Sequence, residues 1–133
     1  MEPKPPFLGR EYADQFQDES VAQAYRARPA YPSELFPFLA SLSANGFEPV
    51  LELGSGTGDL SFGFAEYCAT LVAVEPSRAM LDVAIRRGRD LGSERIRWNH
   101  SSAEDFGYAG PYSLIAAAES LHWMDWSLVM PRI

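Results

Sequence analysis

Short apolar runs alternate along the chain with segments whose apolar residues recur at helical spacing. The runs are the length of buried strands and contain many Val, Leu, Ile and Ala residues. We expect strands over these runs, at 50–53, 71–75, 96–98 and 112–118. Between the first three, the spacing predicts helices over 59–69 and 77–91, with Asp59 and Ser77 as their N-caps. Strands that alternate with helices build a parallel sheet, so the predicted fold class is α/β, doubly wound.

The N-terminal part is less regular. Residues 11–28 are polar with scattered aromatic residues, which predicts a weakly amphipathic helix that a proline-rich segment ends. Ser33 is the predicted N-cap of a second helix over 34–44, and Asn45-Gly46 would end it. Its spacing predicts a buried face made of Leu35, Phe38, Leu39 and Leu42.

A turn with glycines at alternate positions follows the first predicted strand: Gly54, Gly56 and Gly58. A strand, a glycine-rich turn and a helix start together hold a polar ligand at the carboxyl end of the strand. Dinucleotide binders carry their third glycine three positions after the second, and here the spacing is two. Asp59 would also repel a pyrophosphate at the start of the helix. Glu75 ends the second strand, where an acid accepts hydrogen bonds from a ribose. These residues predict a site for a nucleoside without a diphosphate.

Composition excludes several classes of protein. The 133 residues fit one domain, and the net charge of −7 argues against binding to nucleic acid. Cys68 is the single cysteine, which predicts no internal disulfide and a reducing, cytoplasmic setting. No apolar run approaches the roughly 20 residues of a membrane span, and no spacing suits a metal site.

Several segments resemble motifs of class I S-adenosylmethionine-dependent methyltransferases, in the small-molecule (type 11-like) branch. In chain order these segments are 26–32, 50–58, 72–77, 101–106 and 121–125. The resemblance extends from about residue 16 to residue 126 and implies a Rossmann-like sheet. It divides the chain into a lead-in over 1–32, which covers the cofactor and substrate, and the N-terminal part of the methyltransferase domain over 33–133.

The resemblance implies S-adenosyl-L-methionine as cofactor and a small molecule as methyl acceptor. The implied cofactor-binding residues are Arg28, Glu52, Gly54, Ser55, Gly56, Glu75, Pro76, Ser77, Ser102, Ala103, Glu104, Ala118 and Glu119. Glu75 would accept from both ribose hydroxyls, and the Ala103 backbone would contact the adenine. Two positions depart from the family pattern, because Ser102 and Ser113 stand where acids are usual.

Methyl transfer from a sulfonium needs alignment and a dry site more than acid–base groups. His122 is the candidate base if the acceptor is an alcohol or an amine, and a half-buried packing role is its alternative. A nicotinamide-dependent oxidoreductase is a competing hypothesis that the glycine spacing disfavours. A second competing hypothesis is a non-catalytic or incomplete S-adenosylmethionine-binding module. The segment 114–118 is apolar on both faces, which is typical of a central strand. We therefore expect a sheet that is incomplete at the C-terminus, to be completed by a further segment or by a partner.

Overall fold

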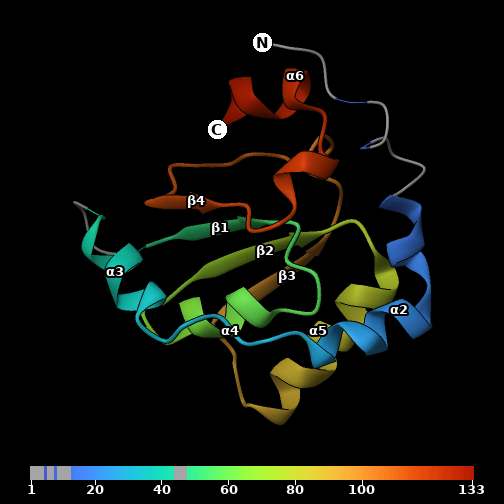
Figure 1. Ribbon diagram of the computed structural model, residues 1–133. Helices are drawn as coiled ribbons and strands as arrows, with labels where there is room; N and C mark the ends of the chain where they lie inside the picture. Colours follow the sequence, from blue (N-terminus) through green and yellow to red (C-terminus); the bar gives the residue numbers. More distant parts are fainter. Residues whose placement is uncertain (1–4, 6–7, 9–12, 44–47) are drawn as a thin grey trace.

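The computed structural model describes residues 5, 8, 13–43 and 48–133. Within these residues it contains a wholly parallel sheet whose strand order is β3-β2-β1-β4 (Figure 1). The strands are β1 (Val50–Leu53), β2 (Leu71–Glu75), β3 (Ile96–His100) and β4 (Leu114–Ala116). The predicted α/β class is confirmed. β3 is two residues longer than the prediction, and β4 is shorter than the predicted 112–118.

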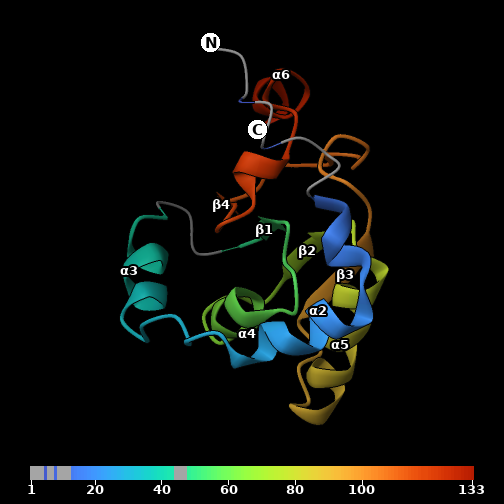
Figure 2. The same cartoon turned by 45° about the vertical axis from the view of Figure 1, so that its right-hand side comes forward.

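Side chains along β1 alternate between two cores, because successive residues of a strand point to opposite faces. Val50 packs with Phe64 and Leu60 on the face that carries α3 (Leu35–Ser41) and α4 (Asp59–Ala65). Leu51 and Leu53 pack on the other face, against the loop after β3 and α6 (Trp126–Val129). Figure 2 shows α4 and α5 (Arg78–Asp90) together on one side of the sheet and α6 on the other.

The helix starts differ in part from the prediction. Ser77 caps α5 as predicted, since its hydroxyl accepts from the Met80 amide at 3.1 Å. α4 begins after Gly58, which has a φ of +88°, so Asp59 is the first helical residue and the predicted Asp59 cap is wrong. The predicted Ser33 cap is also wrong, because Glu34 precedes α3 and makes no side-chain cap bond.

α3 also buries a different residue from the predicted set. Phe36 is its buried residue, and its ring lies 5.8 Å from that of Phe64 in α4. Phe38 and Leu42 are 59% and 63% exposed, so half of the predicted buried face is wrong. Asn45 and Gly46, the predicted end of this helix, lie outside the described residues.

The lead-in is not one helix. It contains η2 (Asp14–Gln17), α2 (Glu19–Ala24) and η3 (Tyr25–Ala27), because Asp18 interrupts the first turn and caps α2. Ala22 of α2 is buried against Met80 and Val83 of α5. Figure 1 shows α2 beside α5. This packing holds the lead-in beside the carboxyl end of β2.

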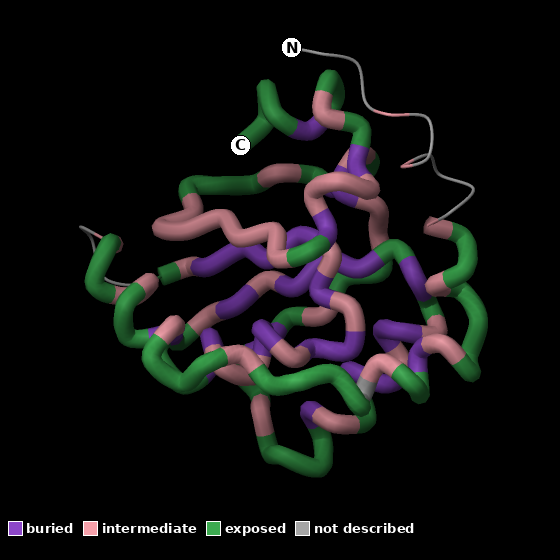
Figure 3. The backbone as a smooth tube through the Cα atoms, in the orientation of Figure 1, coloured by how far each residue is buried: buried purple, intermediate pink, exposed green. Residues whose placement is uncertain are grey.

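The end of the chain returns above the sheet through η4 (Leu121–Trp123), α6 and η5 (Met130–Arg132). α6 begins at Trp126, and Asp125 caps it by accepting from the Ser127 amide at 2.9 Å. β1 and β2 are mostly buried, whereas β4 is half-buried along its length (Figure 3). In the described part of the chain, no helix has the length and apolar character needed to cross a membrane.

Candidate functional site

A cleft of about 1230 Å³ opens at the carboxyl ends of β1, β2 and β4, bounded on one side by the lead-in. Every residue that the sequence assigned to cofactor binding lines this cleft. These residues are Arg28, Glu52, Gly54, Ser55, Gly56, Glu75, Pro76, Ser77, Ser102, Ala103, Glu104, Ala118 and Glu119. The parallel topology explains why they meet, since carboxyl ends of parallel strands lie at one edge of the sheet.

Gly54 lies where the turn after β1 touches the segment after β4. Its φ is +72°, and a Cβ placed on it would stand 2.4 Å from the Ser120 Cβ. Ser120 is fixed there because its hydroxyl donates to the Leu53 carbonyl at 2.6 Å. Gly54 is therefore required by both backbone conformation and space.

Gly56 is different, because it lines the cleft with a φ of +56° and a Cβ on it would meet nothing within 4 Å. A bare backbone next to open space allows a ligand to approach the turn closely. Next to it, the Ser55 hydroxyl is buried and has no hydrogen-bond partner among the described residues. Buried polar atoms are nearly always paired, so this hydroxyl is available to a bound group.

Glu75 joins the glycine turn to the start of α5. Its two carboxylate oxygens accept from the Gly56 amide and from the Ser77 amide, each at 2.8 Å. Burial raises the pKa of Glu75, while the two amides and His100 oppose the rise. The carboxylate is thus held in position at the end of β2, as expected for a ribose acceptor.

Glu52 is 2% exposed and accepts from the Ser61 hydroxyl at 2.5 Å. Burial raises the pKa of Glu52 from its ordinary 4.5 to about 8; the Ser61 hydrogen bond lowers it, and Glu75 and Asp59 add to the rise. In the folded protein Glu52 therefore keeps its proton to a higher pH than an ordinary glutamate does. A cation in the cleft would stabilise the ionised form and favour release of that proton.

The loop after β3 is fixed by its own residues and by the end of the chain. The Ser102 hydroxyl donates to the Asp105 carboxylate at 2.8 Å and accepts from the Asp105 amide at 3.1 Å. The Glu104 carboxylate accepts from the Asp125 amide at 2.6 Å. Ala103 is buried beside the cleft, and its carbonyl accepts from the Tyr108 hydroxyl at 3.0 Å.

His122 is not among the described residues that line the cleft. It lies in η4, half-buried, with its ring centroid 4.6 Å from that of Trp123, and Trp123 is the residue of this turn that reaches the cleft. The structure gives His122 a ring contact with Trp123 and places it outside the cleft lining among the described residues.

Tyr31 and Asp59 also line the cleft, although the sequence did not assign them to cofactor binding. Burial raises the pKa of the Tyr31 hydroxyl. Asp59 forms an ion pair with Arg87 at 2.7 Å, so its negative charge is partly balanced. The glycine spacing therefore disfavours a pyrophosphate more than Asp59 does. Tyr31 lies inside the 26–32 segment and Asp59 directly follows the 50–58 segment, so the motif resemblance is the signal that could have found them.

Fold and site together define a Rossmann-like α/β protein with a nucleoside-type cleft. The family model of the methyltransferase domain matches residues 50–131, so the chain belongs to this family. Membership of the methyltransferase family, which the motifs predicted, is confirmed.

Relatives agree with this assignment. Rv3342 of Mycobacterium tuberculosis, an uncharacterized methyltransferase, is 32% identical over 121 residues, which are 86% of this chain and 44% of that protein. The CcbJ methyltransferase of Streptomyces caelestis is 27% identical with a TM-score of 0.62, over 73% of this chain and 41% of CcbJ. The N-methyltransferase NodS of Bradyrhizobium japonicum, solved with S-adenosylhomocysteine, shares the fold at 22% identity and a TM-score of 0.60, over 73% and 48%. The chain thus spans less than half the length of each of these proteins.

Proposed function

We propose that the cleft binds S-adenosyl-L-methionine and that the protein transfers its methyl group to a small-molecule acceptor. The observation that carries the proposal is the bond from the Gly56 amide to Glu75, which joins the bare glycine turn and the ribose-type acid in one cleft. Family membership supports the same class of reaction. The acceptor and the activity of the whole protein are part of the proposal, since the chain matches less than half the length of these relatives.

The residues of the cleft suit this cofactor. Glu75 would hold the ribose, Ser102 and Ala103 would contact the adenine edge, and Gly54 and Gly56 would lie against the part near sulfur. When bound, the cofactor supplies a methyl group on a positively charged sulfur. The acidic lining of the cleft favours the positively charged cofactor. The walls of the cleft would exclude water and fix the direction from which the acceptor approaches the methyl group.

No proton transfer is assigned to His122, because it does not line the cleft among the described residues. An acceptor that is already an anion needs no base. Glu52 and Tyr31 are the titratable groups at the cleft wall whose pKa values burial raises. An acceptor that must lose a proton would meet these two groups before His122.

We also propose that β4 pairs with a further strand, from another segment or from a partner chain. In the described residues β4 pairs with β1 alone and its three residues are only half-buried. An apolar strand with one open edge favours pairing with another strand. The test is the oligomeric state by light scattering, together with the mass of the native chain. A monomer of this chain alone, stable at high concentration, would contradict the proposal.

The test of cofactor binding compares S-adenosylhomocysteine with NAD by isothermal titration. The wild type should bind the former and not the latter. Glu75→Ala should weaken binding by at least about tenfold, because it removes hydrogen bonds to a charged acceptor. Glu75→Gln keeps an acceptor oxygen and should lose less. Glu66→Ala, at an exposed glutamate outside the cleft lining, is the matched control. Equal affinity in wild type and Glu75→Ala, or binding of NAD alone, refutes the proposal.

A further inference from the structure

The loop after β3, residues 101–108, is held by a side chain that comes from η5. The Arg132 guanidinium donates to the Glu104 carbonyl and, through its other terminal nitrogen, to the Phe106 carbonyl at 2.6 Å. The two carbonyls are two positions apart, so one side chain spans the turn of this loop. The planar fork of donors on arginine suits two acceptors at once, whereas lysine offers a single point charge.

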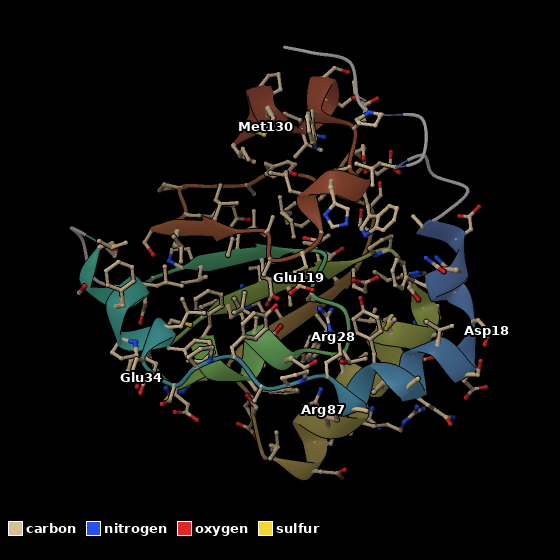
Figure 4. The ribbon with its side chains drawn as sticks, in the orientation of Figure 1. Asp18, Arg28, Glu34, Arg87, Glu119 and Met130 are labelled. Atoms are coloured by element: carbon tan, nitrogen blue, oxygen red, sulfur yellow. The ribbon has the colours of Figure 1, made fainter. Side chains whose placement is uncertain are left out.

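The segment that carries Arg132 is itself anchored. Val129 at the end of α6 is completely buried and belongs to the same core cluster as Phe106. The Arg132 guanidinium also lies over the Tyr108 ring, 4.6 Å from its centroid, which favours its position. Figure 4 labels Met130, the first residue of η5, above the sheet in that view. The bonds from Arg132 therefore join the loop to a segment that packs in the core.

The part of this loop that reaches the cleft is the backbone at Ala103. Ala103 is 4% exposed and lines the cleft. Its carbonyl accepts from the Tyr108 hydroxyl, whereas its amide has no acceptor among the described residues. Burial raises the pKa of Tyr108 while Arg132 opposes the rise, so the hydroxyl remains a donor at neutral pH. Buried amides are nearly always paired, so the Ala103 amide is available to an acceptor on a ligand.

The neighbouring Ser102 makes this amide more important. The Ser102 hydroxyl donates to the Asp105 carboxylate and accepts from the Asp105 amide. Its one donor and one of its two acceptor sites are therefore used inside the loop. Recognition of a base by this loop thus depends more on the position of the Ala103 amide than on the Ser102 side chain.

We propose that Arg132 is a positioning residue that holds the loop with the Ala103 amide at the cleft, and so sets selectivity for adenine over a 6-oxopurine. Adenine presents its N1 as an acceptor, whereas N1 of hypoxanthine carries a hydrogen. A fixed amide pairs with the first and is left without an acceptor by the second. Arg132 does not line the cleft, so it acts through the loop. This inference rests on the proposed function, since it concerns the base of the same cofactor.

The first test compares S-adenosylhomocysteine with S-inosylhomocysteine, which differs in its base alone, by isothermal titration. The wild type should bind the adenosyl ligand at least about tenfold more tightly. Arg132→Gln should weaken binding of S-adenosylhomocysteine by about tenfold and of S-inosylhomocysteine by less than about twofold, so that the preference is lost. Arg132→Lys should keep part of the preference, because an ammonium can hold one of the two carbonyls.

Arg95→Gln is the matched control for the loss of charge. The Arg95 guanidinium also donates to a backbone carbonyl, that of Ala65 at 3.2 Å, but Arg95 lies outside the cleft lining. This variant should leave the affinity for both ligands unchanged. A control that lost the preference would show that any such arginine bond affects the cleft.

The second test measures hydrogen exchange without ligand. The Phe106 amide donates to the Ser102 carbonyl at 3.0 Å inside the loop. Arg132→Gln should speed exchange of this amide by at least about tenfold, because opening of the loop then breaks fewer bonds. The Val50 amide, which donates to the Thr70 carbonyl at the start of β1, should exchange at the wild-type rate.

The outcomes separate this inference from the proposed function. A wild type that binds neither ligand refutes the proposed function and the selectivity with it. If the wild type binds S-adenosylhomocysteine and Arg132→Gln keeps the same ratio of affinities, the inference fails while the proposed function stands. Equal losses for both ligands, or faster exchange at Val50 as well, would show a general effect on the fold and overturn the inference. If Arg132→Gln does not fold, Arg132→Lys decides, with thermal unfolding as the check of its fold.

Discussion

Replacing Gly54 by alanine tests whether the glycine turn is held by its contact with the segment after β4. The new Cβ would lie 2.4 Å from the Ser120 Cβ and 2.8 Å from its Oγ, so backbone or side chain must move. Overpacking of this kind costs about 1–3 kcal/mol. The φ of +72° adds about 1–2 kcal/mol for a residue with a Cβ. We expect Gly54→Ala to lower the free energy of unfolding by about 2–5 kcal/mol.

Two other glycines provide matched controls. Gly92 follows α5 with a φ of +64°, and a Cβ there would meet nothing within 4 Å, so Gly92→Ala carries the backbone cost alone. Gly56→Ala carries a similar backbone cost but puts a methyl group at the cleft wall, so it should lose binding of S-adenosylhomocysteine. Urea unfolding measures the stability of the three glycine variants, and isothermal titration measures their binding of S-adenosylhomocysteine. Equal stability of Gly54→Ala and Gly92→Ala would refute the packing argument.

Two further predictions concern buried polar groups. Glu52 keeps its proton to a higher pH in the folded state than in the unfolded chain, so the wild type loses stability as pH rises from about 4.5 to about 8. Glu52→Gln should remove this loss: urea unfolding should show no difference at pH 4.5 and a more stable variant at pH 8, by at most about 5 kcal/mol. Ser77→Ala removes the cap of α5 and the bond to the Phe16 carbonyl at 2.5 Å. It should cost about 1 kcal/mol in the same measurement.

Each of these predictions has an outcome that contradicts it. A constant difference between Glu52→Gln and wild type from pH 4.5 to pH 8 would show that Glu52 is ionised in the folded protein. For Ser77→Ala, the matched control is Ser93→Ala, at a half-buried serine after α5 whose side chain makes no cap bond. If both serine variants lose equal stability, the cap of α5 contributes nothing specific.

The sequence determined the fold class and the place of the cleft. β1 and β2 are apolar runs of strand length, and helical spacing separates them, which is sufficient for a parallel sheet. Ser77 was predictable as a cap because a serine directly before an apolar helical pattern commonly accepts a hydrogen bond from a free amide of the first turn. Gly54, Gly56 and Glu75 were predictable as site residues because their types and spacing follow from local backbone demands at the ends of two adjacent strands.

Local patterns failed where an element is short or where an end depends on distant contacts. α3 buries Phe36 because of its position against α4, whereas its own spacing favoured Phe38 and Leu42. The lead-in is divided because Asp18 caps a new helix, and its place on α5 depends on Ala22. His122 and Trp123 are adjacent, and only the turn of η4 decides which of them reaches the cleft.

Only the tertiary structure decided which charges face one another. Arg28 and Glu119 are 91 positions apart, and Arg87 and Asp59 are 28 apart, so no spacing rule relates either pair. The first pair forms because the lead-in packs on α5 and ends opposite the left-handed turn after β4. The second forms because α4 and α5 lie on the same face of the sheet. Sequence patterns report local backbone preferences and the face a residue buries, whereas charge pairing across a cleft depends on how separate elements pack.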